Sequence, residues 1–306
     1  MPLHRLSGPF VGVLTILCWS AYNVAAKHGI DTGMSPEALV FLRFSVPGIV
    51  AVPVLLILVA RGRTLGIPVS RLLVLVLLGG PLFGLAAVSG YVHAPLSHGL
   101  LFAPVAVFLM SSLLGRLLLR EPVTGRRMGA AALMFAALAI LVGLDMRAVG
   151  TAWSQGAAFF VLAGAMWGAY IVLLRHWCIP MPEGAVGVAA GAALVALPVL
   201  GAAAVETLRT APAAEIALQA LMQGVVGGVI SVVALIGVVR TLSVHTASLL
   251  PVFTPVVALG IAYVLFGAVP SGAEVAGVAI IAIGFVVSLG LRVPEGWSNR
   301  VSHAHR

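Results

Sequence analysis

The sequence predicts an all-α polytopic membrane protein of ten transmembrane helices, arranged as two inverted-topology five-helix repeats. Three observations support this fold class: few charged residues, apolar runs of membrane-spanning length, and an internal repeat. Of the 306 residues, 61% are hydrophobic and only 8% are charged, compared with about 25% charged residues in an ordinary globular domain. So few charges cannot cover a water-exposed surface, and the chain is therefore expected to lie in lipid.

Apolar runs between Pro, Gly and charged residues define the ten predicted spans. Each run is long enough to cross a hydrocarbon core of about 30 Å as a helix. In chain order the spans are 9–29, 36–60, 71–91, 97–118, 127–145, 154–175, 184–206, 218–239, 246–267 and 271–291. The first run has some features of a signal peptide, but its motif returns deep inside the chain, which indicates a retained span.

The distribution of Lys and Arg between the spans predicts the orientation. With the N-terminus in the cytoplasm, 13 of the 17 basic residues fall on the cytoplasmic side. Short cytoplasmic segments of membrane proteins are enriched in Lys and Arg, so both termini, including the tail 292–306, are expected there. The net charge of +8 is attributed to this bias. Nucleic acid is not an expected partner, because the basic residues form no stripe or aromatic-interleaved patch.

A motif near the N-terminus returns in the second half of the chain. The stretch CWSAYNVAAKH, residues 18–28, is repeated as MWGAYIVLLRH, residues 166–176. Further matches at offsets of 146 to 148 residues pair Pro36-Glu37 with Pro182-Glu183, Gly79-Gly80 with Gly227-Gly228, His98–Val105 with His245–Val252, and Gly125 with Gly272. Because five is an odd number of spans, the second half is expected to cross the membrane in the opposite sense. The predicted repeats are 9–145 and 154–291.

These motifs together resemble the EamA-type family of the drug/metabolite transporter superfamily. The resemblance rests on the Trp-containing motifs, on SPEALVFLRF at residues 35–44, and on LLREPVTGRRMGA and LFGAVPSGAEVAGVA after two Pro-containing spans. It implies a secondary transporter, an exporter of small metabolites such as amino acids or related amphipathic compounds, that works by alternating access in the bacterial inner membrane. The family's Gly-Glu pair is replaced here by Arg120-Glu121 and Gly267-Ala268, which predicts an asymmetric pathway.

Arg43 is the sharpest candidate for substrate binding. It lies about 10 Å along the helix from the start of the second span, where a charge costs several kcal/mol unless it is paired or hydrated. A partner side chain, a cavity or an anionic substrate group would satisfy it. The alternatives are snorkelling to the outer headgroups and a structural pair with Glu37, and the sequence leaves both interpretations open.

Aromatic and polar side chains provide further candidates for a substrate pathway. In the first span, Trp19, Tyr22 and Asn23 share one helix face, which can stack on and hydrogen-bond a small organic molecule. Packing between helices is the alternative. Histidines are included because imidazole titrates near neutral pH, although loop histidines more often face interfacial water. The predicted pathway residues are Trp19, Tyr22, Asn23, Arg43, Tyr91, His93, His98, Trp167, Tyr170, His245 and Tyr263.

Small residues and prolines predict where helices pack closely or bend. Two Gly-x-x-x-Gly spacings, Gly80/Gly84 and Gly224/Gly228, allow helices to approach each other. Close packing, with hinging as an additional role, is predicted for Gly79, Gly80, Gly84, Gly224, Gly227 and Gly228. Prolines remove backbone donors and are expected to kink the fourth and ninth spans, which makes these spans candidate pathway walls. The three prolines are Pro104, Pro251 and Pro255.

The sequence gives no support for catalysis or for a bound cofactor. It has no GxxxxGK[ST] nucleotide loop and no HExxH or GxSxG motif. Cys18 and Cys178 form neither a disulfide framework nor a metal pattern. No catalytic residue, metal or cofactor is predicted. An intramembrane enzyme acting on a lipid-linked substrate and a non-transporting sensor are the alternative functions.

The sequence leaves two modes of energy coupling open and indicates the classes of partner. No acidic residue is expected near the midplane of a span, so a carboxylate proton relay is not evident. Coupling through histidine and facilitated diffusion both stay open. The expected partners are a small-molecule substrate and membrane lipid, with the chain acting as a monomer or a homodimer.

Overall fold

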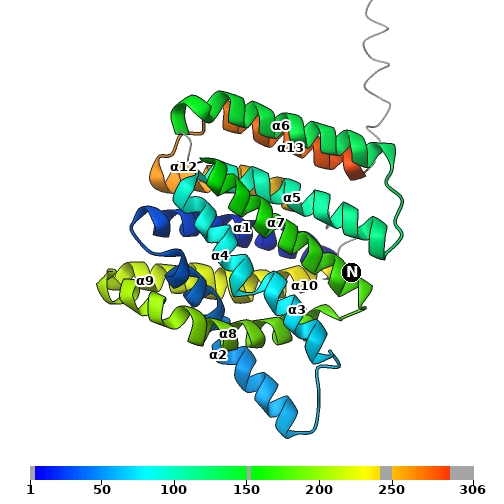
Figure 1. Cartoon of the computed structure of the whole chain (residues 1–306), viewed down its shortest axis with the longest axis vertical. Coiled ribbons are helices and arrows are strands. Elements are labelled where there is room, and N and C mark those ends of the chain that lie inside the picture. The colour runs from blue at the N-terminus through cyan, green and yellow to red at the C-terminus, as the bar shows by residue number, and fades with distance from the viewer. Residues whose placement is uncertain (1–3, 150–152, 242–249, 290–306) are drawn as a thin grey trace, which may run out of the picture.

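The computed structural model describes residues 4–149, 153–241 and 250–289, and the regular elements within these ranges are all helices (Figure 1). In chain order they are α1 (His4–Asp31), α2 (Pro36–Ala60), α3 (Val69–Gly79), α4 (Pro81–His93), α5 (Leu96–Leu118), α6 (Gly125–Val149), α7 (Trp153–His176), α8 (Met181–Thr210), α9 (Ala213–Gln219), η1 (Ala220–Ile230), α10 (Ser231–Thr241), α12 (Leu250–Phe266) and α13 (Gly272–Leu289).

Eight of the described helical segments are long and apolar enough to cross a membrane. Two of them are composite: α3 and α4 together form one span, and α9, η1 and α10 together form another. Two further apolar helices, Phe253–Phe266 and Gly272–Ser288, are shorter and take the places of the ninth and tenth predicted spans. The all-α membrane fold is therefore confirmed, whereas the number of ten spans stays a prediction.

The third span is not the continuous helix that its apolar pattern predicts. It breaks at Gly80, between α3 and α4. A Cβ atom at Gly80 would overlap the backbone carbonyl oxygen of Val76, so glycine is needed at this close approach. Pro81 then begins α4, at the position where a missing backbone N–H costs least.

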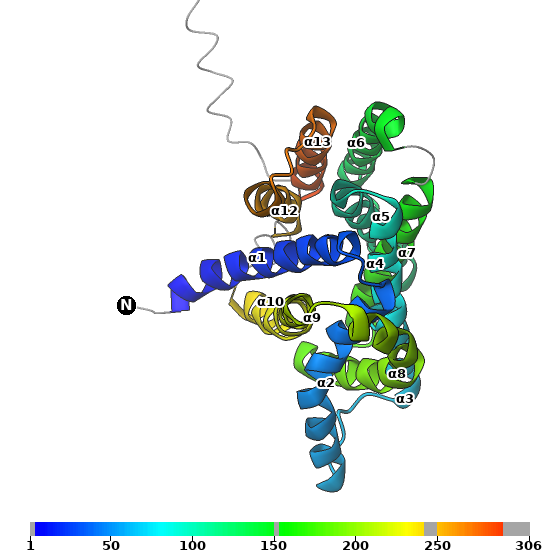
Figure 2. The same ribbon diagram turned by 90° about the vertical axis from the view of Figure 1, so that its left-hand side faces the viewer.

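The helix packing follows a two-fold pattern between the halves of the chain. Helix α2 packs on α8, and α6 packs on α13, which joins the predicted equivalent spans two and seven, and five and ten. The contact of α5 with α7 has a counterpart in the contact of α12 with α1, and the contact of α4 with α7 has a counterpart in the contacts of η1 and α10 with α1. Figure 2 shows α1 running between α12 on one side and α9 and α10 on the other.

The turns that follow α5 and α12 have the same backbone conformation. Arg120 (φ 57°) and Gly267 (φ 65°) are both left-handed. The N–H of Glu121 donates to the carbonyl of Gly115 (3.1 Å), and the N–H of Ala268 donates to the carbonyl of Ala262 (3.4 Å). Such a bond from the residue after a left-handed position closes a helix C-terminus. The equivalence of 120–121 with 267–268 thus extends from sequence to backbone geometry.

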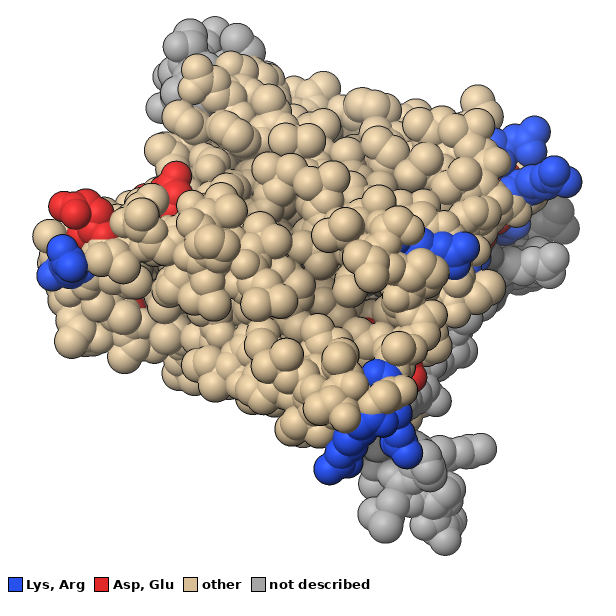
Figure 3. Space-filling model, turned by 60° about the horizontal axis from the view of Figure 1, so that its bottom comes forward, with Lys and Arg blue, Asp and Glu red and all other residues tan. Residues whose placement is uncertain are grey.

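Charged side chains separate to the two ends of the helices (Figure 3). We call one end the basic end; its arginines are Arg61, Arg63, Arg71, Arg116, Arg120, Arg126, Arg127 and Arg175, with Glu121 and Glu183. The opposite, acidic end has Asp31, Glu37, Glu206, Glu215 and Glu274, with Lys27 and Arg209. On the face shown in Figure 3, the described surface between the two ends carries few charged side chains, as a surface facing lipid requires.

Candidate functional site

Arg43 lies on the inner side of α2, at its junction with α1 and η1. Its Nη1 atom donates to Oε1 of Gln223 (3.5 Å), and its guanidinium carbon lies 4.3 Å from the ring centroid of Tyr22. The structural alternative, an ion pair with Glu37, is not observed among the contacts of the described residues. Arg43 therefore contacts an aromatic face and an amide from the first and second repeats.

A line of polar side chains leads from Arg43 to the acidic end. Nε2 of Gln223 donates to Oε1 of Gln219 (3.4 Å), and Nε2 of Gln219 donates to Oε1 of Glu215 (2.9 Å). Oε2 of Glu215 lies 3.5 Å from Nε2 of His28. Both glutamines are fully buried. The line connects a cation inside α2 to a carboxylate in α9, at the acidic end of a different span.

The groups at the two ends of this line fix the orientation of both amides. A carboxylate only accepts hydrogen bonds and a guanidinium only donates them. Gln219 must therefore turn its NH₂ group toward Glu215 and its carbonyl toward Gln223, which in turn presents its own carbonyl to Arg43. Each NH₂ group also donates to a backbone carbonyl of α1. Gln223 donates to the carbonyl of Tyr22 (2.9 Å), and Gln219 donates to the carbonyl of Ala25 (2.8 Å).

A second polar group lies between α1 and α4. The hydroxyl of Tyr91 donates to Oδ1 of Asn23 (3.0 Å), and Nδ2 of Asn23 donates to the carbonyl of Trp19 (2.7 Å). One turn further along α1, Nζ of Lys27 donates to the carbonyl of Tyr91 (3.2 Å) and to Oδ1 of Asp31 (2.6 Å). The amide of Asn23, which is inside a span, thus has its partners.

A cavity of about 320 Å³ adjoins this region at the acidic end. Its polar lining comes from Lys27, His28, Asp31 and Glu274, and its apolar lining comes from α1, α5, α12 and the turn after α12, including Phe266. The ring of Phe266 stacks on His28 with 4.6 Å between centroids. His28 therefore contacts both the cavity and the buried polar line.

The structure brings together four of the predicted pathway residues, Tyr22, Asn23, Arg43 and Tyr91, near α1, while Trp19 contributes its carbonyl. The others lie elsewhere. Trp167 stacks between Phe83 and Tyr170, His93 stacks on Phe159, buried His98 stacks on Phe102, and Tyr263 is 54% exposed. His245 lies outside the described residues.

The predicted glycines lie where helices meet. Gly84 faces Val40 and Phe44 of α2, Gly79 faces the ring of Tyr170, Gly227 faces Tyr22, and Gly224 and Gly228 face Val46 and Pro47. Gly80 instead lies at the break between α3 and α4. Pro104 lies inside α5 and Pro255 inside α12, whereas the side chain of Pro251 lies outside the described part of the chain.

Sequence reasoning missed the polar line as a unit. Gln219, Gln223 and Glu215 are not among the pathway residues selected from the sequence. Their spacing of four residues was an available signal, because residues four apart share a helix face. The contacts of Gln223 with Arg43 and of Glu215 with His28 link residues 180 or more positions apart, which no local pattern reveals.

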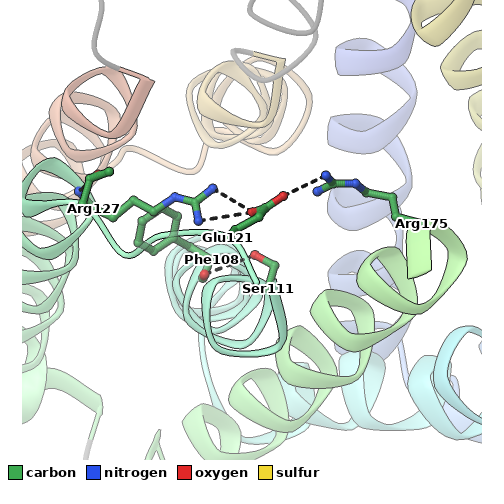
Figure 4. Close-up of polar contacts among 6 residues, drawn as sticks. Phe108, Ser111, Glu121, Arg127 and Arg175 are labelled. Atoms are coloured by element: carbon green, nitrogen blue, oxygen red, sulfur yellow. Dashed lines mark hydrogen bonds and ion pairs between the residues drawn. The ribbon is translucent and has the colours of Figure 1, made fainter. Parts of the chain in front are cut away.

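A separate charged cluster lies at the basic end, and Figure 4 shows Glu121 between two arginines. Oε1 of Glu121 accepts from Nη2 of Arg175 (2.8 Å), and Oε2 accepts from Nη1 and Nη2 of Arg127 (3.4 and 3.3 Å). The hydrogen bond from Arg175, together with the charges of both arginines, lowers the pKa of the Glu121 carboxyl below its usual value. The carboxylate is therefore the stable form at this site.

Comparison with known proteins identifies the family. A family model described as the EamA-like transporter family matches residues 6–143 and again residues 154–290. No curated protein matches the chain. Among solved structures, one described only as a crystal structure of a protein is 23% identical, with a TM-score of 0.59, and the similarity covers 93% of this chain and 98% of that chain. At this identity the likeness concerns the fold alone. Because the family model matches both repeats, the chain belongs to the EamA-like transporter family and is a multi-pass membrane protein.

Proposed function

We propose that the chain is a secondary transporter of small metabolites, and that amino acids and related amphipathic compounds with a carboxylate are its leading substrates. The observation that carries this proposal is Arg43. Among the described residues, no carboxylate forms an ion pair with it. A cation inside a span requires a counter-charge or water, and a substrate carboxylate can supply that charge.

The surroundings of Arg43 suit this role. A guanidinium has five N–H donors, and the hydrogen bond described for Arg43 uses only Nη1. Its planar fork matches a carboxylate with two parallel hydrogen bonds. The ring of Tyr22 supports the guanidinium from one face, so the remaining donors can point toward a ligand.

We also propose that transport proceeds by alternating access and in the outward direction. The matched packing of the two halves supports alternating access, since two repeats related in this way can exchange conformations. The excess of arginine at the basic end supports a cytoplasmic location of that end, with the protein in the bacterial inner membrane. Outward transport is proposed from the family.

The test is transport by purified protein in liposomes, with and without a pH gradient, using a panel of amino acids, nucleobases and cationic drugs. Arg43→Gln keeps a donor for Gln223 but removes the charge. Loss of a buried, hydrogen-bonded charge should lower transport of carboxylate compounds about 30-fold or more. Arg63→Gln, at an exposed position between α2 and α3, is the matched control. Equal carboxylate transport by wild type and Arg43→Gln would refute the assignment of Arg43.

A further inference from the structure

The two repeats place equivalent residues at opposite ends of the molecule, so the ends can be compared position by position. At the repeat offset of 147 or 148 residues, Glu121 corresponds to Ala268, Arg127 to Glu274, and Arg175 to Lys27. The matching backbone turns at 120–121 and 267–268 support the same alignment. Three positions that form an ion cluster at the basic end therefore have three counterparts at the acidic end.

At the basic end, the cluster joins the two repeats. Glu121 lies between α5 and α6 of the first repeat, and Arg175 lies in the last turn of α7 of the second (Figure 4). Arg127 holds the other carboxylate oxygen from the first turns of α6. An isolated exposed ion pair contributes little, but here one carboxylate, 26% exposed, accepts from two arginines.

At the acidic end, the same three positions do not form a cluster. Ala268 has no charge. Lys27 instead binds Asp31 within its own helix, at 2.6 Å. Glu274 accepts from the backbone N–H of Ser271 (2.7 Å) and so caps its own helix. All three positions line the cavity of about 320 Å³, where Asp31 is also exposed.

We propose that Glu121, Arg127 and Arg175 form a latch that holds the basic end of the protein closed at rest, and that the acidic end stands open because Ala268 replaces the latch carboxylate. The latch concerns the resting conformation of the substrate-free protein. It rests on the proposed function in one respect: the two ends are taken as the two gates of a single substrate site that opens to each side of the membrane in turn.

The latch has a direct test in distances between spin labels. At the basic end, labels are placed at Leu117→Cys and at the native Cys178, both exposed. At the acidic end, they are placed at Thr32→Cys and Val269→Cys in a Cys178→Ser chain. Cys18 is only 4% exposed and is left unchanged. Electron–electron double resonance on the substrate-free protein in lipid nanodiscs then gives both distance distributions.

Glu121→Gln removes the charge but keeps the shape of the side chain. We expect the ratio of short to long basic-end distances to fall about tenfold, as for the loss of one charge-assisted hydrogen bond, and the acidic-end distances to shorten. Ala268→Glu combined with Glu274→Arg rebuilds the latch charges at the acidic end. As with Glu121→Gln, the basic-end distances should lengthen and the acidic-end distances should shorten. Arg126→Gln, which removes a neighbouring charge that is exposed, should leave both unchanged.

Distributions for Glu121→Gln that match those of wild type and Arg126→Gln would overturn the latch. If Glu121→Gln does not fold, raising the salt on the wild-type protein replaces it, because about 1 M salt shortens the Debye length to about 3 Å. The basic-end distances should then lengthen, and unchanged distances would again overturn the proposal. Since no substrate is used, a failure of the latch is distinguishable from a failure of the transport assay.

Discussion

At the scale of single residues, Arg43 obtains its setting from contacts that are distant in sequence. Tyr22 lies under its guanidinium, and Gln223 accepts from it. Gln219 and Glu215 fix the orientation of that accepting amide. Arg43 therefore faces a carbonyl oxygen, which stabilises its charge without neutralising it. A residue held in this way keeps its affinity for an anionic ligand.

Replacing the accepting amide with a carboxylate tests this account. Gln223→Glu places a negative charge next to Nη1 of Arg43, and we expect transport of carboxylate compounds to fall about 30-fold or more because the site becomes neutral. Transport of uncharged compounds should change little. Gln155→Glu makes the same substitution at an exposed position and serves as the control. Parallel losses for charged and uncharged compounds would indicate a purely structural role for Gln223.

Arg120 provides a second prediction at the residue scale. Its φ of 57° is in the left-handed region, which costs a non-glycine residue about 1–2 kcal/mol. Arg120→Gly, which copies the equivalent Gly267, should therefore stabilise the protein by about 1 kcal/mol. Thermal unfolding in detergent measures the change. Arg120→Ala is the control, because it removes the charge but retains the unfavourable backbone; equal stability of the two variants would contradict the explanation.

At the scale of helices, the π-helix η1 positions the site. It carries Gln223, and it contains Gly224, Gly227 and Gly228 at its contacts with α2 and α1. π-Helical segments are rare and occur frequently at functional sites. The small residues allow η1 to approach α2 closely enough for Gln223 to reach Arg43. Helix packing and ligand binding therefore depend on the same residues.

A larger side chain at this contact should separate the helices. A Cβ at Gly224 would overlap Val46, so Gly224→Ala is expected to destabilise the protein by about 1–3 kcal/mol and to weaken transport. The control is Gly129→Ala on α6, where nothing lies within 4 Å of the new Cβ; it should be neutral or stabilise by up to about 1 kcal/mol. Thermal unfolding of both variants decides the point, and a Gly224→Ala variant as stable as the control would disprove close packing there.

At the scale of the whole molecule, the ends of the protein differ although the repeats match. The basic end has an ion cluster that joins the repeats, and the acidic end has a cavity at the corresponding place. A symmetric packing pattern with asymmetric charges favours one conformation over the alternative in which the two repeats exchange conformations. The few residues that break the symmetry therefore determine the resting state.

The pH dependence of the basic end follows from Glu121. Its pKa is lowered in the folded protein from the usual 4.5, so its contribution is fully present above that value and is lost as the pH falls through the lowered pKa. The basic-end spin-label distances should thus be constant from neutral pH down to about 5 and lengthen only in more acidic solution. Glu121→Gln should show no such transition, and a transition near neutral pH would assign the effect to another group.

The sequence determined the membrane class, the apolar segments and the two repeats, because composition and periodicity are local properties that each segment carries by itself. It also identified Arg43, Tyr22, Asn23 and Tyr91 as polar or aromatic residues within spans. The break at Gly80, the orientation of the Gln219–Gln223 line and the pairing of Glu121 with Arg175 were decided only by the tertiary structure. These features depend on the close approach of segments that lie far apart in the chain, and the free energy of such contacts is set by packing and not by local pattern.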